Sequence, residues 1–156
     1  MKNVFSIKSV LISGIAATAM MTLFTYMAPL MGIKMNIPAM IADAMGLPLV
    51  FGWAAHFMIG IILAFIYAGI YLPATKSESS LKNGAIYSLF PWLMAQIVVM
   101  PMMSAMKGMD LISGLFSGSI LQAMGSLAGH VVYGLVLGKL YSLGIGKKYV
   151  EKFAGN

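Results

Sequence analysis

Residues 51–72 read FGWAAHFMIGIILAFIYAGIYL, and this stretch decides the fold. It carries no charged residue and exceeds the roughly 20 apolar residues that an α-helix needs to cross the hydrocarbon core of a bilayer. Two other uncharged stretches, 10–31 and 85–103, predict two further membrane-spanning helices by the same criterion. We therefore expect an all-α integral membrane protein.

A fourth apolar stretch, 111–143, would measure about 50 Å as a single helix, which is longer than a bilayer core. We expect it to break near Ala123-Met124-Gly125, leaving 124–143 as the fourth span and 111–122 as an interfacial or re-entrant piece. Between the first two spans, apolar residues recur at helical spacing after Pro38, which predicts a short helix on the membrane surface.

The composition excludes several classes of function. Hydrophobic residues make up 60% of the 156 residues and charged residues only 9%, so 1–156 is expected to be a single membrane domain without a soluble catalytic unit. The net charge of +6 does not predict a nucleic-acid partner, because the lysines lie between apolar stretches. Without cysteine there are no disulfides or thiolate nucleophiles. No hydrolytic or oxidoreductase motif is present, which favours a protein that is not an enzyme.

The distribution of lysine predicts the orientation in the membrane. Four spans place both termini and the loop 73–83 on one side, and that side carries eight of the ten lysines. Because positively charged residues are retained on the cytoplasmic side, both termini are expected there, in a multi-pass protein of the bacterial inner membrane. The two outer loops contain one lysine each, Lys34 and Lys107.

The second and fourth spans match each other at an offset of 74 residues. This offset places His56 on His130, the only two histidines of the chain, and Gly60 on Gly134. The other matched pairs are Gly52 with Ser126, Ala64 with Gly138 and Tyr67 with Tyr141. The first and third spans match less well, at an offset of 72, with Pro29 on Pro101 and Met31 on Met103. We therefore expect two tandem helical hairpins, 10–72 and 85–143, related by a pseudo-two-fold axis along the membrane normal.

Residues four apart lie on one face of a helix, so the matched positions form a stripe of small residues on the second and fourth spans. In membranes such stripes mark close helix packing. We expect these two spans to pack against each other along the stripes, with both histidines near the outer third of the bilayer. Tyr67 and Tyr141 are expected to be aromatic residues of the cytoplasmic interface.

His56 and His130 have a structural and a functional interpretation. In the structural one, each imidazole bonds to the other, to a backbone carbonyl, or to Thr18, Thr22, Gln96 or Gln122 and fixes the packing. In the functional one, ionisable residues inside the membrane mark a binding site. One candidate ligand is a b-type haem held by both imidazoles, for which Gly60 and Gly134 leave room. Its propionates would have few cationic partners.

Methionine suggests a second candidate ligand, because the chain contains 16 of them. Thioether sulfur and imidazole suit Cu(I), which predicts a metal site formed by His56, His130, Met31 and Met103. The alternative is that methionine fills irregular gaps and covers the lipid-facing surface of a methionine-rich membrane protein.

The arrangement resembles small four-helix bacterial inner-membrane proteins of uncharacterised function. The resemblance depends on Trp53-Ala-Ala-His56-Phe-Met-Ile-Gly60 and on Gly129-His130-Val-Val-Tyr-Gly134, each followed by a tyrosine, and on the region 22–29 of the first span. It implies a bacterial membrane protein and no catalytic residues.

The sequence leaves two classes of function open. The first is a non-catalytic membrane subunit or scaffold, packed through its small-residue stripes against other helices in a homo-oligomer or a larger complex in the lipid bilayer. The second is a ligand-binding or transport protein that uses the symmetric histidine pair, with haem b or copper as candidate cofactors.

Overall fold

The computed structural model describes residues 5–33 and 35–144, apart from the side chain of Met31. Over these residues all regular secondary structure is helical. Four helical segments are long and apolar enough to cross a membrane: Ile7–Leu30, Leu49–Ala74, Leu81–Met106 and Ile120–Ser142. The prediction of four helices of membrane-spanning length is therefore confirmed.

The spans are built from shorter elements. The first consists of α1 (Ile7–Met27) and a short 3-10 turn, η1 (Ala28–Met31). The second consists of α3 (Leu49–Ile66), the π-helical segment η2 (Tyr67–Tyr71) and α4 (Leu72–Ala74). The third consists of α5 (Leu81–Met94), the π-helical segment η3 (Ala95–Val99) and α6 (Met100–Met106). The fourth is α7 (Ile120–Ser142), and α2 (Ile37–Met45) and η4 (Leu111–Gly118) lie in the connections.

Both π-helical segments end two residues before a proline, Pro73 for η2 and Pro101 for η3. A proline has no N–H for the helical bond to residue i−4, and its ring collides with that residue's carbonyl. The residues at i−4, Gly69 and Ile97, both lie inside the π segments. A wider turn at these points relieves the collision and lets each span continue through its proline.

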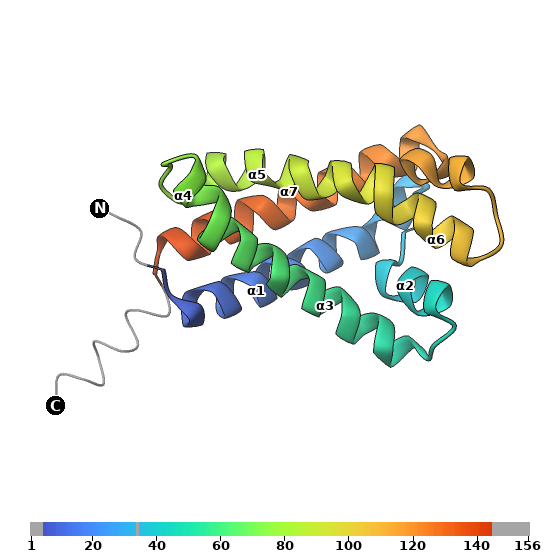
Figure 1. Ribbon diagram of the computed structural model, residues 1–156, viewed down its shortest axis with the longest axis horizontal. Helices are drawn as coiled ribbons and strands as arrows, with labels where there is room; N and C mark the ends of the chain where they lie inside the picture. The colour runs from blue at the N-terminus through green and yellow to red at the C-terminus, as the bar shows by residue number, and fades with distance from the viewer. Residues whose placement is uncertain (1–4, 34, 145–156) are drawn as a thin grey trace, which may run out of the picture.

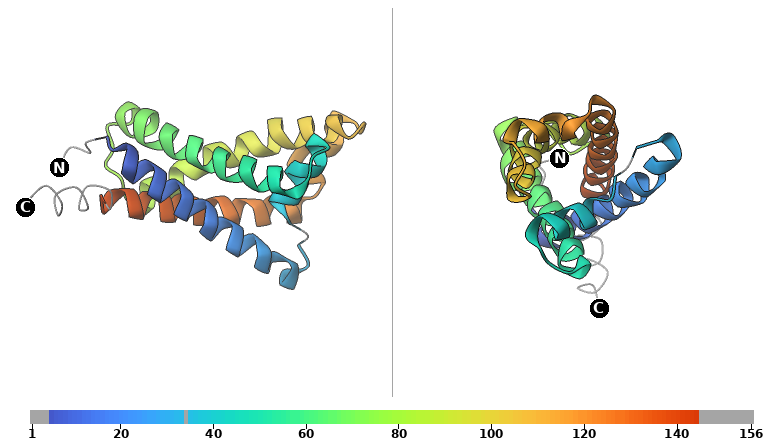
Figure 2. Two further views of the ribbon diagram at one scale, coloured as in Figure 1. Left: turned by 90° about the horizontal axis from the view of Figure 1, so that it is seen from below. Right: turned by 90° about the vertical axis from the view of Figure 1, so that its right-hand side faces the viewer.

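The four spans form a ring. α1 packs against both α3 and α7, and α5 packs against α7 and reaches η2. α3 and α7 are therefore diagonal to each other. The helices converge at the terminal end, where α1 begins and α7 ends, and splay apart at the loop end, near α2 and η4 (Figures 1 and 2).

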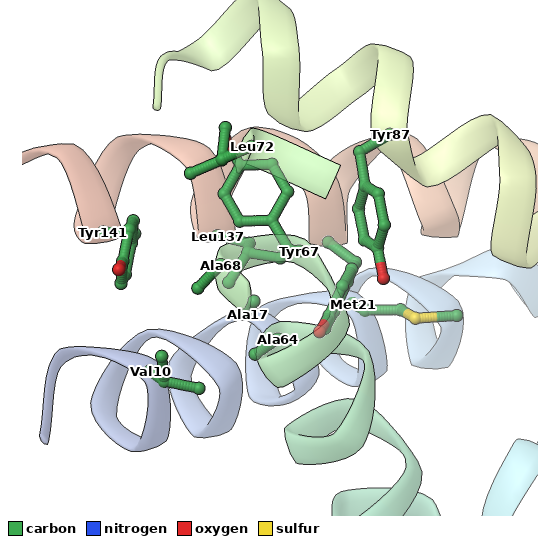
Figure 3. Close-up of a cluster of buried hydrophobic side chains, with 11 residues drawn as sticks. Val10, Ala17, Met21, Ala64, Tyr67, Ala68, Leu72, Tyr87, Leu137 and Tyr141 are labelled. Carbon is green, nitrogen blue, oxygen red and sulfur yellow. The ribbon is translucent and has the colours of Figure 1, made fainter. Parts of the chain in front are cut away.

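A cluster of buried side chains closes the terminal end of the bundle (Figure 3). Tyr67 has 0% exposed surface, and its ring centre lies 5.1 Å from that of Tyr87 and 6.2 Å from that of Tyr141. Its hydroxyl donates to Ser79 Oγ at 3.0 Å, and Ser79 Oγ donates to the Gly138 carbonyl at 2.8 Å. The prediction that Tyr67 and Tyr141 are interfacial aromatics is therefore wrong. They continue the inward stripes at i+3 spacing, so they face the core.

At the loop end, α2 confirms the short helix expected after Pro38 and packs along the start of α3. The contact is close at Gly52, where a Cβ would collide with the Pro38 carbonyl and the Ala42 side chain. Lys107, at the end of α6, forms an ion pair with Asp43 of α2. This pair joins the two connections to each other.

The break before the fourth span lies earlier than predicted. Ala123-Met124-Gly125 is helical, and the chain leaves helical geometry at Leu115–Ser117 instead, so α7 begins at Ile120. Gly118 adopts a φ of 68°, which favours glycine, and Ser119 is extended at the N-cap of α7. Gly125 has a different function, since it packs against Ile33 and Met35.

The predicted packing of the second span against the fourth is wrong. The stripe on α3 packs against α1, where a Cβ on Gly60 would overlap Thr18, and Ala64 lies against Gly14. The stripe on α7 packs against α5, where a Cβ on Gly134 would overlap the backbone of Gly84. Each stripe therefore packs within its own hairpin, because the nearest backbone that also has small residues at the same depth belongs to the preceding span.

Candidate functional site: a cavity inside the helical bundle

A cavity of about 280 Å³ lies inside the bundle, in the half toward the loop end. Residues of all four spans line it, together with residues of α2 and Ser117 of η4. Its wall on α3 runs from His56 to Leu63, and its wall on α7 runs from Gln122 to Tyr133. The two histidines thus reach one central cavity from diagonal helices.

His56 is held from α1. The Thr22 hydroxyl donates to the Thr18 carbonyl at 2.7 Å, and Thr22 Oγ1 lies 2.9 Å from His56 Nε2. A hydroxyl has one proton, so Thr22 Oγ1 accepts a hydrogen bond from Nε2–H, and we assign the proton of the neutral ring to Nε2. The lone pair of His56 is therefore on Nδ1.

His130 has the opposite tautomer. Its Nδ1 lies 2.8 Å from the Ser126 carbonyl oxygen, one turn earlier on α7. A carbonyl only accepts, so Nδ1 carries the proton and the lone pair of the neutral ring is on Nε2. Nearby, Gln96 Nε2 donates to Ser126 Oγ at 3.2 Å, and Ser117 Oγ donates to Gln96 Oε1 at 2.8 Å. A polar network therefore connects η4, η3 and α7.

Each histidine retains one nitrogen that is not used in packing. No protein group in the described part of the chain bonds to His56 Nδ1 or His130 Nε2, and neither is a fully buried atom without a partner. Both nitrogens are therefore accessible from the cavity that the two rings line. The hydrogen bonds expected for a packing role, to Thr22 and to a backbone carbonyl, are present, but they use only one nitrogen of each ring.

Methionine is concentrated around this cavity. Six lining residues are methionines: Met21, Met35, Met40, Met94, Met100 and Met103. Met103 thus lies in the same cavity as His56 and His130, as the predicted metal set requires, whereas the side chain of Met31 lies outside the described residues. Across residues 5–33 and 35–144, His, Cys, Asp and Glu form no cluster of three or more that could hold a metal ion.

The two glycines predicted beside the histidines have different surroundings. Gly60 lines the cavity, and its carbonyl accepts a hydrogen bond from the Tyr133 hydroxyl at 2.6 Å. Gly134 lies in the contact between α7 and α5, next to Gly84 and Ser88. Room for a ligand is therefore found beside Gly60, and Gly134 serves helix packing.

The rim of the cavity faces outward between α3 and α5. Ile59 of α3, Phe90 of α5 and Val99 of η3 line the cavity and are also exposed on the surface of the bundle. Ile59 and Phe90 lie near the middle of two of the four segments that are long and apolar enough to cross a membrane. Among the described residues that line the cavity there is no Lys, Arg, Asp or Glu.

Comparison with known proteins identifies a family. The family model described as a family of unknown function (DUF6789) matches residues 4–150. The chain belongs to this family. No curated protein and no solved structure gives a significant match.

In this member of the family, sequence reasoning missed the environment of Gln96. Its side chain is 1% exposed and forms hydrogen bonds with both Ser126 and Ser117. From the sequence, Gln96 is expected only as one of several possible hydrogen-bond partners of a histidine. The available signal was Pro101, because a proline inside a span predicts a disturbed turn about four residues earlier. Ser117 reaches Gln96 because the chain leaves helical geometry at 115–117, whereas the sequence predicts this break near 123–125.

Proposed function

We propose that this protein binds a small, neutral, largely apolar molecule inside the membrane, with His56 and His130 as its polar contacts. The observation that carries the proposal is that both histidines line the same cavity, each with one free nitrogen. A cavity with apolar walls and a few convergent polar groups is the usual form of a small-molecule site.

The rim supports entry of the ligand from the bilayer. Ile59 and Phe90 are exposed at the depth of the lipid tails, so an apolar molecule reaches the cavity without crossing water. The absence of charged side chains among the described lining residues favours a neutral ligand, because an unpaired charge in this environment is costly.

Haem b fits this cavity poorly. About 280 Å³ is less than twice the roughly 150 Å³ that accommodates one benzene ring, and a porphyrin is far larger. The described lining residues also offer no cation for the propionates. The carboxylate groups of a haem would therefore be buried without partners.

A scaffold function remains a prediction. The small-residue stripes on which it depended are occupied within the chain, by α1 and α2 on one side and by α5 on the other. Docking of another helix would therefore use the exposed apolar faces, which lipid also covers. The cavity gives the ligand-binding alternative the more specific support.

The proposal includes the duplicated hairpin. Gly14 contacts Gly60 and Ala64, and Gly84 contacts their matched residues, Gly134 and Gly138. These contacts support an internal repeat in which Gly14 corresponds to Gly84, an offset of 70 residues for the first and third spans. Two histidines related by this repeat then meet in the central cavity.

We also propose the orientation with both termini in the cytoplasm of a bacterial cell. The start of α1 and the end of α7 lie at the same end of the bundle (Figure 1), which agrees with an even number of crossings. The lysine distribution supports the direction.

Cu(I) is a second candidate ligand, favoured by the six methionines that line the same cavity as the two histidines. In addition, each histidine donates its other N–H to an oxygen, as metal-binding histidines commonly do. Against it stands the lipid-facing rim, which a hydrated ion does not approach. Titration of purified protein with Cu(I), with Met103→Leu as the comparison, tests this candidate directly.

The main proposal is tested by blocking the rim. Ile59→Trp places a large side chain at the mouth of the cavity, whereas Ile62→Trp makes the same change on the same helix, away from the cavity. The two isoleucines are 45% and 48% exposed, so both variants are expected to fold equally well. Ligand binding is measured in lipid nanodiscs as the rise in thermal midpoint caused by a panel of neutral amphiphiles.

We expect at least one amphiphile to stabilise the wild type and the Ile62→Trp variant, by about 2.7 kcal/mol when its concentration is 100 times Kd. The same compound should have little effect on Ile59→Trp. Equal stabilisation of both variants would show that binding occurs elsewhere. If no compound in the panel stabilises the wild type, the proposal fails.

A further inference from the structure

If the cavity binds a ligand, as proposed above, the hydrogen-bond donors and acceptors left free on its wall restrict the chemistry of that ligand. Three hydroxyl donors on the wall are already directed to protein acceptors. Thr18 donates to the Gly14 carbonyl at 2.8 Å, Tyr133 to the Gly60 carbonyl at 2.6 Å, and Ser117 to Gln96 at 2.8 Å. A ligand that only accepts hydrogen bonds finds few donors there.

Two of the groups that remain free are acceptors. His56 Nδ1 and His130 Nε2 each carry a lone pair and no proton in the tautomers that their hydrogen bonds assign. Gln122 also lines the cavity, and no hydrogen bond of its amide is found within the described residues, so it can donate or accept. A ligand with hydroxyl groups satisfies both histidine nitrogens, whereas a carboxylate or phosphate faces two further acceptors.

The size and the walls of the cavity indicate what bears the hydroxyl groups. A volume of about 280 Å³ suits one substituted aromatic ring, since benzene is accommodated by roughly 150 Å³. Thioether sulfur makes favourable contacts with aromatic rings, and six methionines surround the space. An apolar substituent of such a ring has an exit between Ile59 and Phe90 into the bilayer.

We infer that the cavity binds the aromatic head of a lipid-soluble quinol, with its hydroxyl groups donating to His56 Nδ1 and His130 Nε2 and its apolar tail leaving between α3 and α5. The oxidised form of the same molecule has carbonyl oxygens, which only accept, so it makes neither of these hydrogen bonds. The site therefore prefers the reduced form to the oxidised form.

Three probes that differ only in the head test this inference: a decyl-substituted benzoquinol, the corresponding quinone, and the dimethyl ether of the quinol. Their Kd values are measured without oxygen on full-length protein in phosphatidylcholine nanodiscs, from the ligand-dependent thermal midpoint. We expect the quinol to bind about tenfold more tightly than the ether or the quinone, the upper range for a hydrogen bond gained within a protein.

Two variants locate the preference. His130→Phe keeps a ring of similar size but removes one acceptor, so the ratio of Kd values should fall toward one. Met103→Leu changes a wall of the same cavity and leaves both histidines, so the ratio should persist. Folding of each variant is checked by its thermal midpoint without ligand.

The inference is overturned if the three probes bind equally, or if the quinol preference is as large in His130→Phe as in the wild type. Equal binding that Ile59→Trp abolishes would still support a ligand cavity, so that outcome separates this inference from the proposed function. Absence of quinol binding also overturns the inference, while the panel of amphiphiles decides the proposed function independently.

Discussion

Gly84→Ala is expected to destabilise the bundle more than its size suggests. The Cβ of alanine would lie well inside 3.0 Å of the Gly134 carbonyl oxygen, a separation that real Cβ atoms essentially never show. It would also lie 3.0 Å from Gly138 Cα. Both obstacles are backbone atoms of α7, so no side-chain rotation relieves the overlap. The two helices must move apart.

The magnitude follows from two opposing effects. Overpacking of a well-packed contact costs about 1–3 kcal/mol, and a rigid obstacle places this case at the upper end. Replacing glycine by alanine within a helix stabilises the folded protein by about 1 kcal/mol, because alanine has the higher helix propensity. The net loss is therefore about 2 kcal/mol, or roughly a thirtyfold decrease in the ratio of folded to unfolded protein.

The measurement is reversible unfolding in mixed micelles of a mild detergent with increasing dodecyl sulfate. Gly69→Ala is the matched control, because Gly69 is exposed and its Cβ would make only an ordinary contact of 3.6 Å with Phe5. We expect the control to be neutral or slightly stabilised. Equal free energies of unfolding for the two variants would refute the close contact between α5 and α7.

Three further predictions concern other contacts and the orientation. Tyr133→Phe removes the hydrogen bond from α7 to the Gly60 carbonyl and should lower the free energy of unfolding by about 1 kcal/mol. Tyr26→Phe, at an exposed tyrosine, should leave the free energy of unfolding unchanged. Equal free energies of unfolding for the two variants would mean that this bond contributes nothing. Asp43→Asn breaks the exposed ion pair with Lys107 and should cost less than about 1 kcal/mol, an effect that disappears in high salt. A reporter fused after Asn156 should be cytoplasmic and one inserted near Asp43 external, and reporters on a common side would contradict the topology.

The sequence by itself determined that the chain forms four helices long and apolar enough to cross a membrane. This was possible because crossing a bilayer depends on a local property, about 20 consecutive apolar residues, which no distant contact alters. It also determined which residues face inward, since the stripe that contains His56 and Gly60 follows from helical spacing alone. Tyr67 belongs to the same inward face, and its assignment to the interface was wrong because residue type was preferred to spacing.

Only the tertiary structure decided which inward faces meet. A stripe of small residues does not specify its partner, because any backbone with small residues at the same depth suffices, and Gly14 and Gly84 provide such residues within each hairpin. The cavity depends on the same nonlocal arrangement. α3 and α7 are diagonal, so their histidines face a central space. The π-helical turn before Pro101 changes the face on which later side chains lie, which local periodicity cannot predict, and Gln96 in that turn bonds Ser126 and Ser117 at the cavity wall.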